Sequence, residues 1–366
     1  MNICLVAGAR PNFMKIAPIV RAIQARKDEG LRATIVHTGQ HYDENMSDTF
    51  FRELGIPAPD YHLEAGSGSH AVQTAAIMVA FENVCEQDRP DMVVVVGDVN
   101  STLACSIVSK KLQIAVSHVE AGLRSFDLSM PEEINRMVTD AISDLFFVTE
   151  QSGMDNLLRE GKPKERIHFV GHVMIDNLLY QLGKLDAATC ERFPASSLKK
   201  RLGAYLFLTL HRPSNVDDPE VFSQIADALN TISRTYPIVF PIHPRTRKCM
   251  EKFGIHFDEP IVLLEPLGFM ESLYLWKDAA AVLTDSGGLQ EETTALGIPC
   301  ITLRNNTERP ITIEMGTNVL AGNSKEGILR ALEKQLGRSG SGEPKRPPLW
   351  DGHAAERIVR ILARDV

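Results

Sequence analysis

MVVVVGD, residues 92–98, is the stretch of this chain that decides the fold. Its apolar run does not alternate with polar residues, which is typical of a strand buried on both faces. Such strands occur in parallel sheets whose two faces are covered by helices. On either side of this stretch, short apolar runs alternate with helical patterns. This βαβ rhythm predicts an α/β protein built on a parallel, doubly wound sheet.

The same rhythm extends along the whole chain. In the first half, strands are expected at residues 2–9, 34–39, 92–98, 114–120 and 145–150, and helices at 11–27, 69–87, 102–112 and 131–142. In the second half, strands are expected at 206–211, 238–243, 261–266, 280–287 and 299–304, with helices between them that include 219–235 and 289–296. The chain has 366 residues, which is too long for one ordinary core, so two domains with a ligand cleft between them are predicted. The boundary is expected after Gly171, and the Gly/Ser/Pro-rich residues 337–348 read as a flexible connector before a final helix at 352–364.

Composition excludes several classes of protein. The formal net charge is -8, so a basic surface that binds nucleic acid is not expected. The six cysteines form no C-x-x-C pair, which indicates a reducing compartment without a disulfide framework. No leader-like segment begins the chain, and no apolar run approaches the roughly 20 residues of a membrane span. We therefore expect a soluble cytoplasmic protein.

Carboxylates follow two of the predicted strands in the first half. Asp98 ends the strand at 92–98, and Glu120 ends the strand at 114–120. Residues just past the carboxyl ends of parallel strands lie in the ligand crevice, so the two groups are expected to face one pocket. One of them can then act as an acid while the other stays ionised. The alternative to a catalytic role for Asp98 is a structural one, as a residue near the N-cap of the following helix.

The segment HVEAGLRS…MPEEINR, residues 118–136, adds Glu132 and Arg136. A carboxylate there can move a proton, and an arginine can hold an anion. The alternative is a surface loop followed by a helix whose first turn is acidic because of the helix dipole.

GARPNFMK, residues 8–15, lies at the first strand-to-helix turn. Gly8 allows a tight turn, while Arg10 and Lys15 bring positive charge to a helix N-terminus, where anions bind. The stretch is neither G-x-G-x-x-G nor a P-loop. Its alternative is a turn with two solvated cations.

Two histidines end strands in the second half. His211 in LTLHRPSN and His243 in FPIHPRTR point toward the predicted cleft. A histidine there can serve as acid, base or phosphate partner. The alternatives are a structural histidine and a rigid turn between prolines.

TDSGGLQEE, residues 284–292, carries the strongest phosphate signal. Ser286, Gly287 and Gly288 follow a strand and begin a helix, so their backbone N–H groups suit a diphosphate. Glu292 lies one turn further and would suit a ribose hydroxyl pair, and Arg309 in RNNTERP could approach the diphosphate or the sugar. The alternative is a plain helix cap with an acidic first turn.

GQHYDEN, residues 39–45, either lines the cleft or forms a solvated loop. No histidine spacing matches a metal site, so neither a protein-bound metal nor another cofactor is expected.

As an ordered set, these motifs resemble those of the non-hydrolysing UDP-N-acetylglucosamine 2-epimerases. The matching stretches are GARPNFMK, TGQHYDENMS, GDVNST, HVEAGLRS, MPEEINR, LTLHRPSNVDD, FPIHPRTR, TDSGGLQEE and NNTERP, at residues 8–15, 38–47, 97–102, 118–125, 130–136, 208–218, 240–247, 284–292 and 305–310. The resemblance implies a GT-B-like fold of two Rossmann-like domains with an intervening cleft. The first domain would comprise residues 1–171 plus 350–366, because the last helix returns to it, and the second would comprise residues 172–349.

The resemblance also implies an activity and a site. UDP would be eliminated from UDP-N-acetylglucosamine to give a 2-acetamidoglucal, and would add back with the C2 proton delivered to the other face. The catalytic set would be Asp98, Glu120, Glu132 and His211. The substrate-binding set would be Arg10, Lys15, Arg136, His243, Ser286, Gly287, Gly288, Glu292 and Arg309. The resemblance further implies a homodimer.

Two positions depart from the family's pattern. Ser272 stands where some members carry an aromatic residue that stacks on uracil. Val72 stands where members activated by a second substrate molecule carry an arginine.

Other functions stay open at this point. They are a 2-epimerase of a UDP-2,3-diacetamido uronate, a hydrolysing 2-epimerase that releases UDP, a GT-B glycosyltransferase and a non-catalytic sensor of UDP sugars. The set of three carboxylates argues against a glycosyltransferase, which needs a single base.

Overall fold

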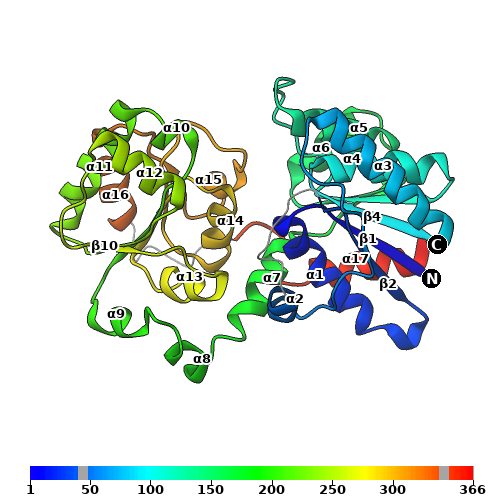
Figure 1. Ribbon diagram of the computed structural model, residues 1–366, viewed down its shortest axis with the longest axis horizontal. Helices are drawn as coiled ribbons and strands as arrows, with labels where there is room; N and C mark the ends of the chain where they lie inside the picture. The colour runs from blue at the N-terminus through cyan, green and yellow to red at the C-terminus, as the bar shows by residue number, and fades with distance from the viewer. Residues whose placement is uncertain (40–47, 338–345, 366) are drawn as a thin grey trace. The chain divides into compact units, whose positions relative to one another are not determined.

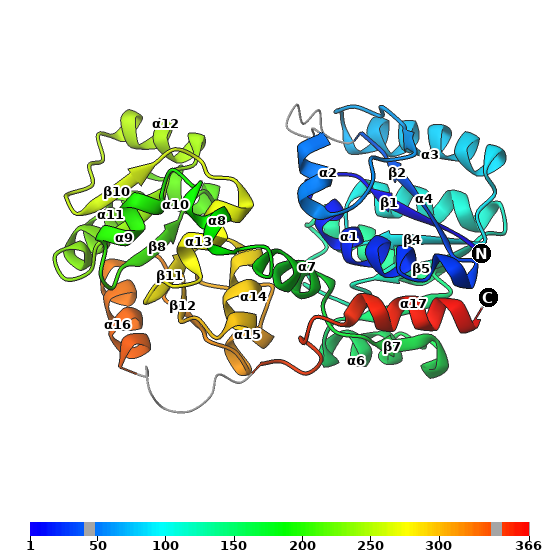
Figure 2. The same ribbon diagram turned by 90° about the horizontal axis from the view of Figure 1, so that it is seen from below.

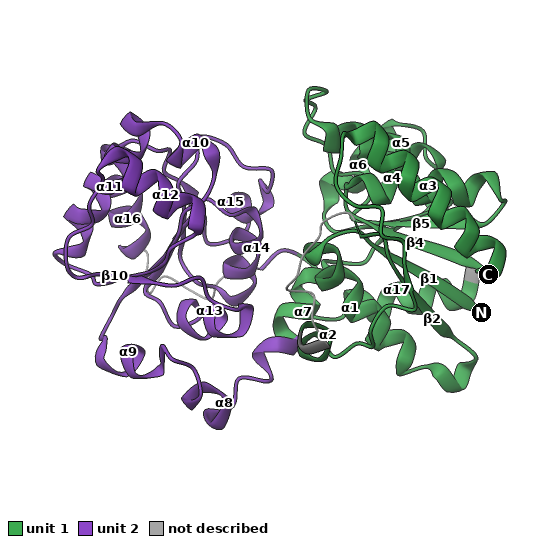
Figure 3. Ribbon diagram, in the orientation of Figure 1, with its two compact units in different colours: residues 1–179, 348–366 green, residues 180–347 purple. Residues whose placement is uncertain are grey.

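The chain builds two parallel sheets, each covered by helices, as the computed structural model shows for residues 1–39, 48–337 and 346–365 (Figure 1). Each sheet belongs to one compact unit (Figure 3). Unit 1 comprises residues 1–179 and 348–366, and unit 2 comprises residues 180–347. The predicted α/β class with two doubly wound sheets is confirmed.

The sheet of unit 1 has seven strands in the order β3-β2-β1-β4-β5-β6-β7, and every neighbouring pair is parallel. The strands are β1 (Asn2–Ala7), β2 (Arg32–His37), β3 (Tyr61–His62), β4 (Met92–Val96), β5 (Ala115–Val119), β6 (Leu145–Val148) and β7 (Ile167–Phe169). The central strand β4 is buried along its whole length, which its unbroken apolar run predicts. The strand order reverses between β1 and β4, and ligands bind outside the carboxyl ends at such switch points.

The helices of unit 1 follow the strands in turn. They are α1 (Arg10–Gln24), α2 (Asp48–Leu54), α3 (His70–Gln87), α4 (Asn100–Lys111), α5 (Pro131–Ile142), α6 (Gln151–Arg159), α7 (Val173–Leu182) and α17 (Ala354–Asp365), with short 3-10 turns at Lys27–Glu29 and Lys164–Arg166. Residues at the helix N-terminus explain where two of these helices begin. Ser69 accepts the backbone N–H of Val72 at 3.3 Å at the start of α3, and Pro131 occupies the first position of α5.

The last helix, α17, belongs to the core of unit 1. Its side chains Ala354, Ile358, Val359 and Leu362 are buried in the same cluster as those of α1 and β1. Figure 2 shows α17 running beside α1. The carboxylate of Asp176 on α7 accepts the backbone N–H groups that begin α17. The chain therefore leaves unit 1 at α7 and comes back to it at its end.

Unit 2 repeats the design with six strands in the order β10-β9-β8-β11-β12-β13, again all parallel. The strands are β8 (Leu206–Thr209), β9 (Ile238–Pro241), β10 (Ile261–Leu264), β11 (Ala281–Thr284), β12 (Cys300–Thr302) and β13 (Asn318–Leu320). The helices are α8 (Ala187–Glu191), α9 (Ser196–Arg201), α10 (Pro213–Val216), α11 (Pro219–Ser233), α12 (Pro244–Phe253), α13 (Phe269–Trp276), α14 (Gly287–Leu296), α15 (Ile311–Glu314) and α16 (Lys325–Leu336). Here the order reverses between β8 and β11.

The structure differs from the sequence expectations at the edges. Strands β3, β7 and β13 were not predicted, because they have only two or three residues and end or flank a sheet. The units divide at residue 179 and not at 171, because Val173, Ile175 and Leu178 of α7 are buried, Val173 within the first core. Most of the segments GQHYDEN and 337–348 lies outside the described residues.

In the described part of the chain, no helix is long and apolar enough to cross a membrane. All six cysteines are free thiols, and Cys4, Cys85, Cys105 and Cys300 are buried.

Candidate functional site

Several of the predicted site residues lie at the switch points of the two sheets, whereas Glu132 and Arg136 lie on α5 and His243 and Arg309 follow β9 and β12. In unit 1, Gly8 and Arg10 follow β1, while Gly97 and Asp98 follow β4. In unit 2, residues 211–212 follow β8 and residues 285–288 follow β11. Each sheet thus presents its candidate residues where doubly wound folds bind ligands.

Lys15 and Glu120 form an ion pair at the switch point of unit 1. The ammonium of Lys15 lies 2.5 Å from Glu120 Oε2, and Glu120 is only 5% exposed. Glu120 has a left-handed backbone (φ 70°), a costly conformation that clusters at functional sites. Gly97 leaves the space for this pair, since a Cβ there would lie 2.9 Å from Lys15 Nζ and 3.7 Å from Glu120 Oε2. The end of β4 is therefore adjacent to the Glu120 carboxylate.

Asp98 pairs with Arg136, whose Nη1 lies 2.5 Å from Asp98 Oδ2. The other side of Arg136 is held by Glu133, which also accepts the backbone N–H groups of Ser125 and Phe126 at 2.9 and 3.0 Å. Burial raises the pKa of Glu133, but these backbone donors and Arg136 outweigh it and hold the pKa below its ordinary value. Glu133 thus fixes the arginine that reaches Asp98.

Glu133 was missed as a site residue by the sequence analysis, which chose its neighbour Glu132. Glu132 is exposed in the first turn of α5, whereas Glu133 is buried. The three predicted carboxylates therefore have different surroundings, because Glu120 is buried beside a lysine, Asp98 is one-third exposed beside an arginine, and Glu132 is open. Environments that differ in this way allow carboxylates to take different roles.

The start of α1 is fixed by Asn12, a second residue that the sequence analysis missed. Its side-chain oxygen accepts the N–H of Ala9 at 3.0 Å, and its amide donates to the Val96 carbonyl at 3.2 Å. Arg10 stacks over the ring of Phe50 at 5.1 Å. The arginine is therefore oriented by packing at this edge.

His211 and Asp285 form the corresponding pair in unit 2. The Nδ1 atom of His211 lies 3.0 Å from Asp285 Oδ1, while Asp285 Oδ2 accepts the backbone N–H groups of His211 and Arg212 at 2.8 and 2.7 Å. Burial raises the pKa of Asp285, but the hydrogen bond and charge of His211 and the two N–H groups outweigh it and keep the pKa low. A buried carboxylate on Nδ1 orients the imidazole and leaves Nε2 for a ligand. The sequence signal for Asp285 was its place at the end of a strand.

His243 is the N-cap residue of α12, and its ring lies 5.7 Å from that of His211. Its Nδ1 accepts the N–H of Arg245 at 3.1 Å, so the ring hydrogen is on Nε2. Burial and the neighbouring His211 lower the pKa of His243. His243 is therefore a neutral imidazole that can donate through Nε2.

The N-terminus of α14 is open at Ser286, Gly287 and Gly288. No side chain caps this helix end. A Cβ at Gly288 would meet nothing within 4 Å, and one at Gly287 would meet only Glu308 Oε2, at 3.9 Å. Packing therefore does not require glycine at either position. Close approach of an anion to the backbone N–H groups would require it, because a side chain there would block the approach.

Two glutamates follow in α14. Glu291 pairs with Arg309 at 2.5 Å. Burial, and then the neighbouring Glu291, raise the pKa of Glu292 to about 8. A carboxylic acid is therefore kept protonated close to neutral pH at this position.

We expect Glu292→Gln to change how stability depends on pH. At pH values between the ordinary pKa of a glutamate and the raised pKa of about 8, the folded protein holds a proton on Glu292 that the unfolded chain has lost. The free energy of unfolding therefore falls as pH rises through this range. The substitution should remove this fall, on the order of a few kcal/mol between pH 5 and pH 8. Urea unfolding at pH 5, 6.5 and 8, followed through Trp276 of unit 2 in a Trp350→Phe background, measures it. Glu251→Gln is the exposed control, and equal pH slopes for all the proteins would contradict this account.

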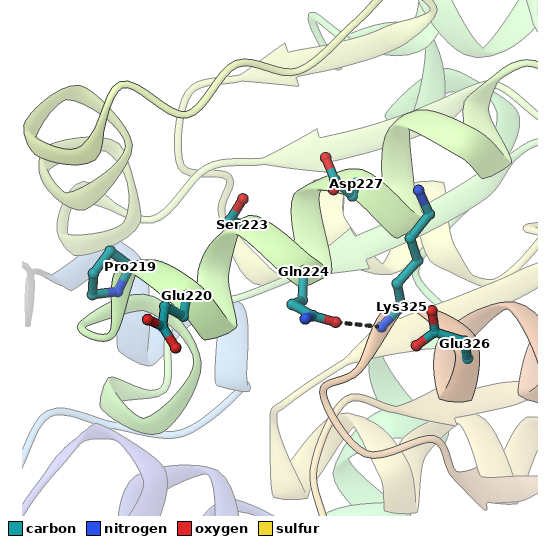
Figure 4. A pocket seen from close by; sticks show the side chains of 7 residues that line it. All are labelled: Pro219, Glu220, Ser223, Gln224, Asp227, Lys325 and Glu326. Carbon is teal, nitrogen blue, oxygen red and sulfur yellow. Dashed lines mark hydrogen bonds between the residues drawn. The ribbon is translucent and has the colours of Figure 1, made fainter.

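A separate hollow of about 590 Å³ lies on unit 2 between α11 and α16 (Figure 4). It is lined by Pro219 and by the polar or charged residues Glu220, Ser223, Gln224, Asp227, Lys325 and Glu326. The side-chain oxygen Oε1 of Gln224 accepts the backbone N–H of Lys325 at 3.3 Å across it. None of the predicted site residues lines this hollow. Over the described ranges, no group of three His, Cys, Asp or Glu side chains is placed to hold a metal ion.

Comparison with known proteins gives a consistent result. A family model described as UDP-N-acetylglucosamine 2-epimerase matches residues 23–363. The UDP-N-acetylglucosamine 2-epimerase of Methanocaldococcus jannaschii is 43% identical over 99% of both chains. The UDP-2,3-diacetamido-2,3-dideoxy-D-glucuronate 2-epimerase of Pseudomonas aeruginosa is 39% identical over the full length of both. A crystal structure of the Methanocaldococcus jannaschii UDP-GlcNAc 2-epimerase in complex with UDP-GlcNAc and UDP matches with a TM-score of 0.82, at 42% identity and 99% coverage of each chain.

Proposed function

The chain belongs to the UDP-N-acetylglucosamine 2-epimerase family, and we propose that it interconverts UDP-N-acetylglucosamine and UDP-N-acetylmannosamine without releasing UDP. The enzyme is an isomerase with a GT-B-like fold. The observation that carries the proposal is the adjacency of the Lys15–Glu120 and Asp98–Arg136 pairs at one sheet edge. The proposed reaction needs carboxylates in different environments to transfer the proton and cations nearby to stabilise the departing diphosphate.

The proposed reaction is an elimination followed by an addition. The C1–O bond to UDP breaks, the C2 proton moves to a carboxylate, and a C1–C2 double bond forms in 2-acetamidoglucal. UDP then adds back to C1 while a proton is delivered to the opposite face of C2. Because the C2 proton is a very weak acid, we expect C–O cleavage to lead and positive charge to build on the sugar ring. Glu120, Asp98 and Glu132 are the candidates to stabilise this charge and to transfer the proton.

Unit 2 is proposed to hold UDP. The open N-terminus of α14 at residues 286–288 suits the diphosphate, with His211 and His243 donating to it. Glu292, protonated or ionised, suits a ribose hydroxyl pair. Arg10, Lys15 and Arg136 in unit 1 and Arg309 in unit 2 are the cations proposed to bind the substrate.

Gly288→Ala is expected to weaken UDP binding without weakening the fold. Its Cβ would meet no protein atom within 4 Å, so the free energy of unfolding should change little. A bound diphosphate at this helix end would meet the new methyl group, and we expect the Kd for UDP to rise about 10-fold or more. Isothermal titration with UDP and urea unfolding measure the two effects. Gly203→Ala, also in open space within unit 2, is the matched control, and unchanged UDP affinity of Gly288→Ala would remove α14 from the diphosphate site.

Proton NMR of the protein with UDP-N-acetylglucosamine in deuterated water tests the proposed function. UDP-N-acetylmannosamine with deuterium at C2 and little free UDP is the expected result. Free UDP with N-acetylmannosamine would instead identify the hydrolysing reaction. Absence of exchange and of turnover would reject this substrate.

A second substrate has support of its own. The Pseudomonas aeruginosa relative named for a UDP-2,3-diacetamido uronate matches over its full length, at an identity only slightly below that of the Methanocaldococcus jannaschii protein. Both sugars undergo the same inversion at C2. Comparing kcat/KM for the two UDP sugars decides between them, and a higher value for the uronate would overturn our assignment.

We also propose a cytoplasmic homodimer. The free thiols suit a reducing compartment. Helices α3 and α5 of unit 1 expose apolar side chains, including Val79, Ile134 and Met137. Ile134 also lines an apolar hollow of about 410 Å³, together with Met78 and Leu103. An apolar patch of this kind is typical of a subunit interface. Sedimentation should give a dimer for the natural protein and a monomer for Ile134→Glu, whereas a monomeric natural protein would contradict the proposal.

A further inference from the structure

A buried ion network lies beneath the carboxylates of unit 1. His118 on β5 has no exposed surface, and its two ring nitrogens each meet an acceptor. Its Nε2 lies 2.8 Å from the Gly97 carbonyl oxygen, and its Nδ1 lies 2.7 Å from Asp140 Oδ1 on α5. Asp140 Oδ2 accepts the Gly122 N–H at 3.0 Å and pairs with Arg124 at 2.7 Å.

The hydrogen bonds determine the protonation of His118. A carbonyl oxygen can only accept, so Nε2 must carry a hydrogen. Asp140 is ion-paired with Arg124 at 2.7 Å, and its Oδ2 also accepts the Gly122 N–H at 3.0 Å, so the geometry favours its ionised form. Asp140 is therefore a carboxylate, which can only accept, so Nδ1 must carry a hydrogen as well.

The charges of the network balance. Arg124 donates through Nε and Nη2 to both oxygens of Glu160, at 2.8 and 2.7 Å. Two cations, His118 and Arg124, thus alternate with two carboxylates, Asp140 and Glu160. A buried imidazolium is tolerated here because both its N–H groups and its charge are matched.

This network joins the three elements that carry the proposed catalytic carboxylates. Gly97 immediately precedes Asp98 at the end of β4, His118 lies two residues before Glu120 on β5, and Asp140 lies on α5, whose first turn contains Glu132. The carbonyl of Gly97, a residue with a φ of 69°, belongs to the peptide plane that leads into Asp98. Loss of a donor at His118 Nε2 would leave that peptide without its anchor.

We propose that His118, protonated on both nitrogens, is a positioning residue of this enzyme, which fixes the ends of β4 and β5 against α5 through Gly97 and Asp140. Its assignment to the reaction rests on the proposed function of Asp98 and Glu120. The residue itself is buried and does not touch the substrate. Its effect is therefore expected mainly in kcat, because most of the residues proposed to hold UDP lie in unit 2.

Nitrogen NMR of the full-length, substrate-free protein labelled with ¹⁵N-histidine reads the protonation directly. The expected result is one histidine signal with hydrogens on both nitrogens, which disappears in His118→Gln. A signal for His118 with one bare nitrogen would overturn the proposal. This readout needs no catalysis, so it separates the proposal from the proposed function, which the turnover of UDP-N-acetylglucosamine by the natural protein tests independently.

Kinetics tests the positioning role. His118→Gln can donate to one acceptor only, and we expect kcat to fall about 10- to 100-fold, because displacement of a catalytic group by about 1 Å costs about that much. The Kd for UDP should stay unchanged. A kcat close to that of the natural protein would overturn the proposal, and so would a loss confined to UDP affinity.

Two further variants separate loss of the network from loss of folding. Asp140→Asn keeps the size of the partner and removes its charge, so it serves if His118→Gln does not fold, and it should lower kcat as well. In the double variant His118→Gln/Asp140→Asn, the fall in kcat should be smaller than the product of the two single falls, because both substitutions act on one network. Ser117→Ala is the matched control on the same strand, since Ser117 Oγ is buried and makes no hydrogen bond to any described residue. Full multiplication of the two losses, or a kcat loss in Ser117→Ala as large as in His118→Gln, would contradict the proposal.

Discussion

Glu120→Gln is expected to lower kcat by about 10²- to 10⁴-fold, the usual contribution of a positioned acid or base. The amide keeps the size of the buried side chain and can still accept a hydrogen bond from Lys15, 2.5 Å away in the natural protein. It can neither take up a proton from C2 nor place negative charge beside the sugar ring in the transition state. The loss should therefore be almost entirely in kcat, with the fold retained.

Two measurements accompany this prediction. The rate of deuterium incorporation at C2 should fall together with kcat, because both pass through the same proton transfer. The Kd for UDP should stay near its natural value, because the residues proposed to hold UDP lie mainly in unit 2. Glu86→Gln, on the exposed side of α3, is the control. If deuterium exchange survived in Glu120→Gln while net epimerisation stopped, Glu120 would not be the group that removes the proton.

The sequence predicted the parts of this fold that local patterns determine. The buried strand β4 follows from its unbroken apolar run, and α5 spans Pro131–Ile142 as predicted, because proline at a first turn marks a helix start. The edge strands β3, β7 and β13 escaped because two or three residues have no periodicity to detect. Pairing with a neighbouring strand, which is a tertiary effect, creates them.

The candidate site divides in the same way. Asp98 and the residues at 286–288 were chosen as candidates because they stand at strand ends, a position that the sequence reveals. Glu133 and Asp140 were missed, because their importance lies in contacts with residues 3 and 22 positions away, whereas Asp285 follows a strand as Asp98 does and was overlooked. An acidic residue that accepts backbone N–H groups across a fold looks no different in sequence from its exposed neighbour, as Glu132 and Glu133 illustrate.

The return of α17 to unit 1 is likewise invisible to local reasoning. Its apolar stripe predicts a helix that packs on something, but only the family resemblance indicated where. In the structure the stripe completes the core around α1 and β1, at the other end of the chain. Unit 1 is therefore discontinuous, and its stability should depend on its final residues.

Ile358→Ala is accordingly expected to destabilise unit 1 by about 2–5 kcal/mol, the range for truncating a buried isoleucine to alanine. Ile358 has no exposed surface, and the cavity would open between α17 and the core of the sheet. For a unit of this size, each kcal/mol lowers Tm by about 2–4 °C. Arg360→Ala, two residues further on the exposed side of α17, should leave Tm nearly unchanged.

The two tryptophans make this prediction specific to one unit. Trp350 is buried in unit 1, where its indole lies near the Thr149 carbonyl, and Trp276 is buried in unit 2. In a Trp276→Phe background, fluorescence reports unit 1 alone, and the transition should shift strongly with Ile358→Ala. In a Trp350→Phe background it reports unit 2, whose core contains no residue of α17, so the shift should be small. Equal shifts in both backgrounds would mean that the two units unfold as one, and no shift in either would mean that α17 contributes little to the core.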